Sequence, residues 1–168
     1  MDERWMRETR RLFLTLLTRD DAESFHRIIG RDEIGRNLPK GEGYSLDEAR
    51  NWIDGISRHW SRRGYGIWGI VEKVSSDLIG YVGLQYCEEM ENVELLYSIV
   101  PERWGRGYAT ESGLEAIRYG REERNLGTII GLTKLRNDAS ARVLEKCGMT
   151  FKAVTECFGI KCKYFESA

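Results

Sequence analysis

The sequence predicts a mixed α/β fold whose sheet is largely antiparallel and is covered by helices on both faces. Three observations lead to this prediction. Between residues 65 and 100, three β-rich runs follow one another, which is typical of an antiparallel meander. A helix, a strand and a further helix and strand come next, and such a crossover indicates a mixed sheet. The chain has 168 residues, 41% of them hydrophobic, and no linker divides it, so one domain over 1–168 is expected.

The N-terminal part is expected to form one strand and one helix before a loop. Arg11–Leu17, with the sequence RLFLTLL, predicts the first strand. Thr18 or Asp20 is suited to cap a helix that ends near Ile29. Residues 30–44 are rich in Gly and in charged side chains, so they predict a loop.

A second helix and the meander follow. Ser45 and Glu48 have the spacing of a capping box, and apolar residues at helical spacing extend this helix to about Arg62. The loop Ser75-Ser76-Asp77 is a hairpin signal between two of the strands that come next. The three strands of the meander are predicted at 65–74, 78–86 and 93–100.

The C-terminal part predicts two more helices and three more strands. Gly148 suits the left-handed position after a helix, so it marks the end of the second of these helices. The helices are expected to end near residue 124 and to span 139–147, and the strands to span 128–135, 151–157 and 160–165. The complete predicted order is β-α-α-β-β-β-α-β-α-β-β.

The overall charge and the apolar runs exclude several classes of protein. The 26 Lys and Arg residues balance 27 Asp and Glu residues, whereas a general nucleic-acid binder should be basic. The first residues are charged and lack the apolar core of a signal peptide. The apolar runs are too short to cross a bilayer. We therefore expect a cytoplasmic protein that binds neither nucleic acid nor membranes.

Cysteine and histidine placement argues against a metal site. No C-x-x-C pair occurs, and neither histidine lies beside a cysteine in the sequence, so a zinc site is not expected. The thiols are expected to be reduced, with Cys147 and Cys157 acting as small buried apolar residues. A cysteine nucleophile lacks a positioned histidine partner. The residues concerned are Cys87, Cys147, Cys157, Cys162, His26 and His59.

The segment 104–110, Trp-Gly-Arg-Gly-Tyr-Ala-Thr, joins a predicted strand to a helix and has the composition of a phosphate-binding turn. Such a turn exposes unpaired N–H groups at the positive end of the helix dipole. A Walker motif is excluded because the chain contains no Gly-Lys dipeptide. Gly105 and Gly107 fit part of a dinucleotide fingerprint, but Thr110 replaces its last glycine. By itself, the turn also fits an ordinary tight turn.

Two motifs together indicate a family. Trp104-Gly-Arg-Gly107-Tyr-Ala109 resembles the pyrophosphate motif [Q/R]-x-x-G-x-[G/A] of the GNAT superfamily of acetyl-CoA-dependent N-acetyltransferases, with Trp in its first position. The string W-G-R-G-Y-A-T-E is typical of the RimJ/RimL-like branch. The segment Asn137 to Gly148 resembles a second block of that branch, N-x-x-S-x-x-(V/L)-x-E-K-x-G-F. The resemblance implies the GNAT fold, acetyl-CoA as co-substrate and no metal.

The resemblance also assigns residues that would bind the co-substrate. It implies that the strand at 93–100 offers backbone groups to the pantetheine arm and a polarising N–H to the thioester carbonyl. It implies that backbone amides of the turn bind the pyrophosphate and that Asn137 binds the amide groups of the pantetheine arm. Asn137 is also suited to cap the helix. Arg142 is either a phosphate ligand or an ordinary exposed arginine. The full cofactor set is Ser98, Ile99, Val100, Gly105, Arg106, Gly107, Ala109, Thr110, Asn137, Ser140 and Arg142.

Two residues are predicted to take part in proton transfer. Glu94 stands where many GNAT enzymes carry a catalytic glutamate, and its alternative is a solvated charge on an open sheet face. The family often uses a tyrosine to protonate the departing thiolate, but Leu144 occupies that place. Ser140 is the substitute that the RimJ/RimL-like branch offers, and it also suits a cap. His59 is a minor alternative for the base.

The predicted activity is acetyl transfer to a primary amine by direct attack in a ternary complex. The acceptor is either a protein N-terminal α-amine or a small-molecule amine, and residues 31–44 are expected to recognise it. A non-catalytic acyl-CoA-binding module with the same fold is the alternative. Dimers are common in the family, so a homodimer is compatible with the resemblance.

Overall fold

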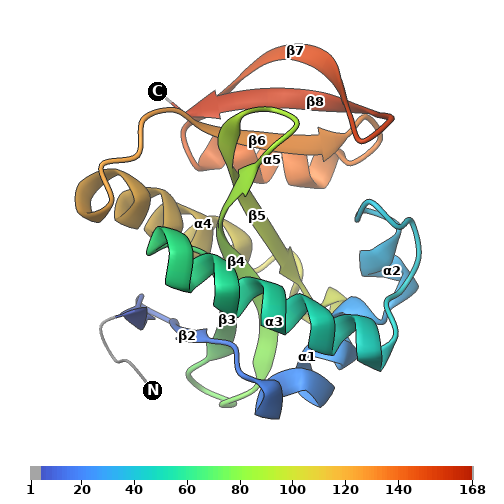
Figure 1. Ribbon diagram of the computed structural model, residues 1–168, viewed down its shortest axis with the longest axis vertical. Coiled ribbons are helices and arrows are strands. Elements are labelled where there is room, and N and C mark those ends of the chain that lie inside the picture. Colours follow the sequence, from blue (N-terminus) through green and yellow to red (C-terminus); the bar gives the residue numbers. More distant parts are fainter. Residues whose placement is uncertain (1–4, 168) are drawn as a thin grey trace.

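The computed structural model describes residues 5–167, so both ends of the predicted domain lie outside the described residues. These residues form one eight-stranded sheet with the strand order β1-β2-β3-β4-β5-β6-β8-β7 (Figure 1). The strands are β1 (Arg7–Glu8), β2 (Leu12–Leu16), β3 (Ile67–Glu72), β4 (Leu78–Cys87), β5 (Asn92–Ile99), β6 (Ile129–Lys134), β7 (Met149–Cys157) and β8 (Ile160–Ser167).

Strand pairing confirms the mixed, largely antiparallel sheet. Strands β2 to β5 form the predicted meander, and every neighbouring pair in the sheet is antiparallel except β5 and β6. The parallel pair arises because α4 crosses over the sheet between these two strands. The β7–β8 hairpin extends the sheet beyond β6 at one end of the molecule (Figure 1).

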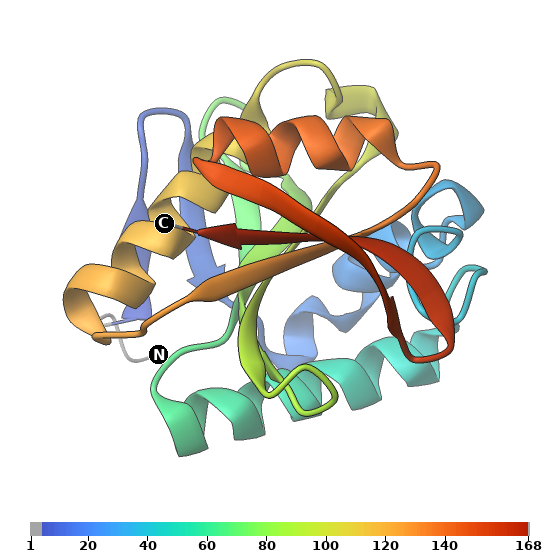
Figure 2. The same cartoon turned by 90° about the horizontal axis from the view of Figure 1, so that it is seen from above.

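Helices cover both faces of the sheet, as predicted. On one face, the ring of Tyr81 in β4 lies 5.9 Å from Phe25 of α1 and 5.4 Å from Trp52 of α3. On the other face, Gly113 of α4 packs near Leu95 of β5. Figure 2 shows α3 and α5 on opposite sides of the strands. The helices are α1 (Ala22–Ile29), α2 (Asp32–Gly35), α3 (Leu46–Arg63), α4 (Tyr108–Arg118) and α5 (Asp138–Lys146).

The predicted helix ends are confirmed at two places. The Ser45 hydroxyl accepts the Glu48 N–H, and the Glu48 carboxylate accepts the Ser45 N–H at 2.7 Å, which completes the capping box of α3. Gly148 has a φ of 80°, so its backbone takes the left-handed conformation after α5. Both ends were predictable because capping depends on residues within one turn.

The structure differs from the prediction in three elements. Residues 30–44 are not all loop, because α2 lies within them and buries Ile34. Strand β1 has only two residues, which is too short for a sequence pattern to reveal. Helix α4 gives way at Tyr119–Glu123 to a π-helical turn, where a continuous helix was predicted.

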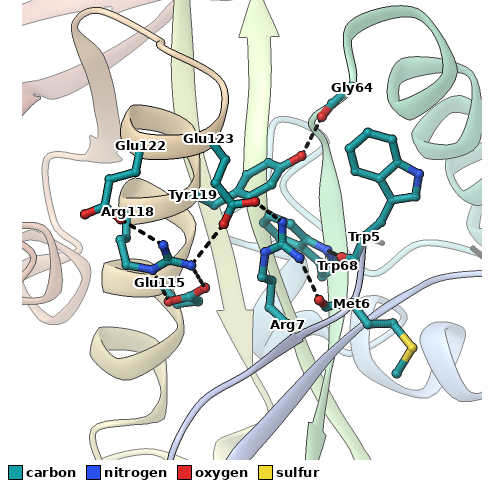
Figure 3. Close-up of polar contacts among 10 residues, drawn as sticks. All are labelled: Trp5, Met6, Arg7, Gly64, Trp68, Glu115, Arg118, Tyr119, Glu122 and Glu123. Atoms are coloured by element: carbon teal, nitrogen blue, oxygen red, sulfur yellow. Dashed lines mark hydrogen bonds and ion pairs between the residues drawn. The ribbon is translucent and has the colours of Figure 1, made fainter. Parts of the chain in front are cut away.

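The first described residues are held against this π-helical turn (Figure 3). The Arg7 guanidinium bonds to the Glu123 carboxylate and lies 4.5 Å from the centre of the Tyr119 ring. The Tyr119 hydroxyl donates to the Gly64 carbonyl at 2.7 Å, and the Trp68 indole donates to the Trp5 carbonyl. These bonds tie the start of the sheet to the end of α4, on the outer side of the molecule.

Candidate active site

A cleft opens where β5 and β6 diverge. The two strands pair only at Val93 with Ile129 and at Glu94 with Ile130. Beyond this point β6 continues its pairing with β8, while the edge of β5 from 95 to 99 has no strand beside it. The cleft has a volume of about 560 Å³ and extends from this edge to α4, α5 and α2. It therefore lies at the point where the parallel pair ends.

The glycine-containing turn forms one wall of the cleft. Gly105 and Gly107 have φ values of 74° and 79°, a conformation that residues with a side chain rarely adopt. Gly107 caps α4, so the first N–H groups of this helix have no partner within it. Among the residues predicted to bind pyrophosphate, Gly105, Gly107, Ala109 and Thr110 line the cleft. Arg106 does not line it and has an exposed side chain.

A buried carboxylate holds this turn from the side of β3. Glu72 is only 5% exposed, and its oxygens accept hydrogen bonds from Arg103 at 2.9 Å and from Tyr108 at 2.7 Å. Ser75 donates a third bond to the same carboxylate at 2.7 Å. The Arg103 guanidinium, together with the two hydroxyls, lowers the pKa of Glu72 to about 2. Glu72 thus joins residues on both sides of the turn through one charged group.

A second carboxylate holds the turn from the side of β2. Glu111 accepts hydrogen bonds from the Thr9 hydroxyl at 2.7 Å and from the Arg11 side chain at 2.7 Å. The Arg11 guanidinium also donates to the Arg106 carbonyl at 2.9 Å and lies over the Tyr108 ring. The glycines give the turn its shape, and these two networks fix its position.

Among residues 98–100, Ile99 is the one that directs its N–H to the open edge of β5. The Val100 N–H donates to the Ile79 carbonyl at 2.9 Å, so it is occupied within the sheet. Residues two apart on a strand direct their N–H groups to the same side, so the N–H of Ser98 also faces β4. The N–H groups that face the cleft are those of Ile99 and Tyr97. The Trp104 indole donates to the Ile99 carbonyl at 2.6 Å, which anchors the turn to this strand.

Glu94 lies at the closed end of the cleft, on the face of β5 that also carries Ser98. Its carboxylate has no hydrogen-bond or ion-pair partner among residues 5–167. Burial raises the pKa of Glu94 to about 8, because the charged form is poorly solvated there. Glu94 is half-buried within the cleft, and this position favours the proposed base over a solvated charge on an open sheet face.

The second motif lies opposite the turn, at the start of α5. The Asn137 side chain accepts the Ser140 N–H at 3.1 Å, so Asn137 caps the helix as predicted. Asn137, Ser140 and Arg142 all line the cleft. Leu144 is only 1% exposed and packs against Gly131 of β6. The Leu144 side chain therefore belongs to the core and does not line the cleft.

His59 has a structural role. Its Nδ1 lies 2.7 Å from the Tyr65 carbonyl, and its Nε2 accepts the Tyr86 N–H at 3.2 Å. Burial lowers the pKa of His59, which favours the neutral ring that this pair of bonds requires. Because both nitrogens are engaged and the ring does not line the cleft, His59 is not placed to act as the base.

All four cysteines are free and buried, as expected of small apolar residues. In the part of the chain that the structure describes, no three His, Cys, Asp or Glu side chains gather in a way that would hold a metal ion. No helix within residues 5–167 is long and apolar enough to cross a membrane.

Sequence reasoning missed three residues of this site. Tyr97, on the open edge of β5, bonds to Ser140 of α5 through its hydroxyl. Glu72 and Glu111 hold the glycine turn. A tyrosine within a largely aliphatic strand was the only signal for Tyr97, and Glu72 lies 31 residues from Arg103 in the sequence, so no local pattern joins them.

Known proteins with similar sequence and structure identify the class. A family model described as acetyltransferase (GNAT) domain matches residues 11–150. The uncharacterized N-acetyltransferase YoaA of Bacillus subtilis is 29% identical over 148 residues, which cover 88% of this chain and 84% of that protein. The chain therefore belongs to the GNAT acetyltransferase family, and it is an acyltransferase. The resemblance drawn from the two motifs is confirmed.

Solved structures share the fold. An acetyltransferase from Agrobacterium tumefaciens str. C58 superimposes with a TM-score of 0.86 at 21% identity, covering 97% of this chain and 94% of that chain. RimL, described as a ribosomal L7/L12 alpha-N-protein acetyltransferase in complex with coenzyme A, gives a TM-score of 0.80 at 14% identity, covering 94% of each chain. The predicted fold class is confirmed.

Proposed function

We propose that this protein transfers the acetyl group of acetyl-CoA to a primary amine by direct attack within a ternary complex. One observation carries the proposal: a half-buried carboxylate without a protein partner lies in the same cleft as a glycine turn with free N–H groups at the start of a helix. The turn is suited to hold the pyrophosphate of the co-substrate, and the carboxylate is suited to accept a proton from the acceptor amine. The cleft thus contains one group suited to the co-substrate and one suited to the acceptor amine.

The co-substrate is proposed to lie along the divergent strands. Its pyrophosphate would accept hydrogen bonds from the free N–H groups that begin α4, at the turn that contains Gly105 and Gly107. Its pantetheine arm would lie beside the open edge of β5, with Asn137 on the opposite wall. The N–H of Ile99 or Tyr97 would then polarise the thioester carbonyl.

Glu94 is proposed as the base that makes the amine nucleophilic. An ammonium group cannot attack, so a proton must leave before the new bond forms. A carboxylate with a pKa near 8 is well matched to a primary ammonium, since an α-amino group has a pKa of about 8. The amine nitrogen then bonds to the carbonyl carbon, and the carbon–sulfur bond breaks.

The acceptor is proposed to be a protein N-terminal α-amine or a small-molecule amine. The first choice rests on motifs of the RimJ/RimL-like branch and on the likeness in fold to RimL, whose described substrate is a ribosomal protein. Residues near α2, such as Ile34 and Leu38, give the acceptor side of the cleft an apolar lining. Homodimer formation and a cytoplasmic location stay predictions.

Acetyl-CoA turnover on a panel of N-terminal peptides and small amines tests the proposal. We expect wild-type protein to acetylate at least one class, and Glu94→Gln to lose most of that turnover while binding CoA normally in calorimetry. Glu88→Gln is the matched control, because Glu88 is 85% exposed on the surface. CoA binding without turnover on any amine would instead indicate the non-catalytic module, and absence of CoA binding would refute both functions.

A further inference from the structure

The hydroxyl groups of Tyr97 and Ser140 are joined across the cleft. The Tyr97 Oη lies 2.6 Å from the Ser140 Oγ and 2.9 Å from the Ser140 carbonyl oxygen, so its single proton can be donated to either of these two oxygens. In the shorter bond, either hydroxyl can be the donor. Tyr97 belongs to β5 and Ser140 to α5, and the two residues are 43 positions apart in the sequence.

Both residues are accessible from the cleft, so the pair is more than a packing contact. Each of them lines the cleft and is partly exposed to it. Strand alternation places Tyr97 on the face of β5 opposite Glu94. A thioester that lies along the open edge would therefore have Glu94 on one side and the hydroxyl pair on the other. This arrangement separates the group that accepts a proton from a group that supplies one.

Three nearby residues are less suited to supply this proton. Leu144, at the position where the family often has a tyrosine, is buried against β6 and has no hydroxyl. The Thr133 hydroxyl is buried and donates to the Asn137 carbonyl. Tyr81 lies on the same face of the sheet as Glu94, which is the face opposite Tyr97. Tyr97 faces the second motif and bonds to its Ser140.

We propose that Tyr97 and Ser140 act together as the proton donor for the departing thiolate. The inference rests on the proposed acetyl transfer. When the carbon–sulfur bond breaks, its electron pair stays on sulfur, and sulfur takes the proton of the Ser140 hydroxyl. Ser140 takes the Tyr97 proton in turn, and water later restores Tyr97. The proton that Glu94 removes from the ammonium and the second amine proton pass to solvent, so one proton is released per turnover.

The chemistry of the two hydroxyls explains why a pair is needed. A thiol has a pKa of about 8.5 and a phenol about 10, whereas an alkyl hydroxyl is a far weaker acid. Ser140 alone would be a poor proton source, but a phenol behind it can replace its proton as it leaves. Burial raises the pKa of Tyr97, which keeps the phenol protonated at neutral pH but makes it a weaker acid, whereas its hydrogen bond to Ser140 lowers the pKa and favours release of the proton.

The test compares Tyr97→Phe, Ser140→Ala and the double variant with wild-type protein. Tyr97→Phe removes only one oxygen atom from the ring. Tyr164→Phe is the matched control, because its hydroxyl bonds to Glu166 on β8, away from the cleft lining. Single-turnover rates with acetyl-CoA are measured in mixtures of H₂O and D₂O, so that the number of protons in motion can be counted. Calorimetry gives the Kd for CoA, and melting curves show that each variant is folded.

We expect Tyr97→Phe to lower the single-turnover rate by about 10²-fold, with a Kd for CoA within about two-fold of wild type. The dependence of the rate on D₂O fraction should be curved in wild type and linear in Tyr97→Phe, because only one proton then moves. The double variant should be no slower than Ser140→Ala, because the two residues act as one unit. Tyr164→Phe should match wild type throughout.

Several results would overturn the inference. One is a Tyr97→Phe rate that equals the wild-type rate; another is a D₂O dependence that the substitution leaves unchanged. A loss of rate that is matched by an equal loss of CoA affinity would show a purely structural role. If Tyr97→Phe unfolds, Ser140→Ala tests the same relay from the other side. If wild type acetylates no amine at all, it is the proposed function that fails.

Discussion

Two glutamates, Glu94 in the cleft and Glu72 beside its glycine turn, have the same chemistry and opposite surroundings. Glu72 accepts hydrogen bonds from three side chains, one of them a guanidinium, and its pKa falls to about 2. Glu94 has no such partner among the described residues, and burial raises its pKa to about 8. At neutral pH, the Glu72 carboxyl group is therefore a fixed negative charge, while the Glu94 carboxyl group is mostly protonated and ionises around pH 8.

This difference shows how the two halves of the site are built. On the co-substrate side, the carboxylates of Glu72 and Glu111 are paired with residues of the glycine turn or beside it, so the turn proposed to bind phosphate keeps its shape before any ligand arrives. On the acceptor side, a carboxyl group is left without a partner at a cost in stability, which is typical of a group with a chemical task.

The largest effect is expected from Glu94 and pH. The kcat/KM of wild-type protein should rise with pH around a midpoint near 8 as Glu94 ionises, and Glu94→Gln should lose this rise together with about 10²- to 10⁴-fold in rate. Steady-state kinetics with two acceptors whose amine pKa values differ provides the measurement. A midpoint that follows the pKa of the acceptor, and not the enzyme, would contradict the assignment.

A smaller effect is expected from substitution of Glu72, and it should weaken the binding of CoA. Glu72→Gln removes the charge that holds Arg103, so the turn should loosen and the Kd for CoA should rise by about ten-fold. Loss of the charged hydrogen bonds should also cost about 2 kcal/mol of unfolding free energy. Calorimetry and denaturant unfolding measure the two effects, with Glu88→Gln as the exposed control. A fall in kcat at unchanged Kd would contradict a positioning role.

The two glutamates should also make the stability of the fold depend on pH in opposite ways. The folded pKa of Glu72 is lowered from 4.5 to about 2, so its contribution is present above pH 4.5 and is lost as pH falls towards 2. The folded pKa of Glu94 is raised from 4.5 to about 8, so stability falls as pH rises from 4.5 to 8. Melting curves should show that Glu94→Gln removes the alkaline loss. A variant that melts like wild type from pH 5 to 9 would exclude the buried, unpaired state of Glu94.

The smallest effect is expected from the turn itself. Gly107→Ala forces a side chain into a left-handed conformation and should cost about 1 kcal/mol of unfolding free energy. Gly41→Ala is the matched control, because Gly41 has a φ of 82° and lies outside the turn. Both variants should lose similar stability, but only Gly107→Ala should weaken CoA binding. Equal CoA affinities for the two variants would mean that the turn does not hold the phosphates.

The sequence was sufficient wherever neighbouring residues decide the structure. The capping box of Ser45 and Glu48 acts within a single helical turn, so its spacing revealed the start of α3. The glycines at 105 and 107 were recognisable because their backbone conformation needs the absence of a side chain. The order of the larger elements followed from hydrophobic periodicity, whereas the two-residue β1 and the four-residue α2 were too short to produce a pattern.

The sequence by itself determined the family, the main elements and the segments that carry the site, because these depend on local spacing. Only the tertiary structure decided which groups are paired. Glu72 and Arg103 are 31 residues apart, and Tyr97 and Ser140 are 43 residues apart. The pKa of Glu94 likewise depends on the packing of distant elements around it. A hydrogen bond or a buried charge is a property of three-dimensional proximity, which no local pattern records.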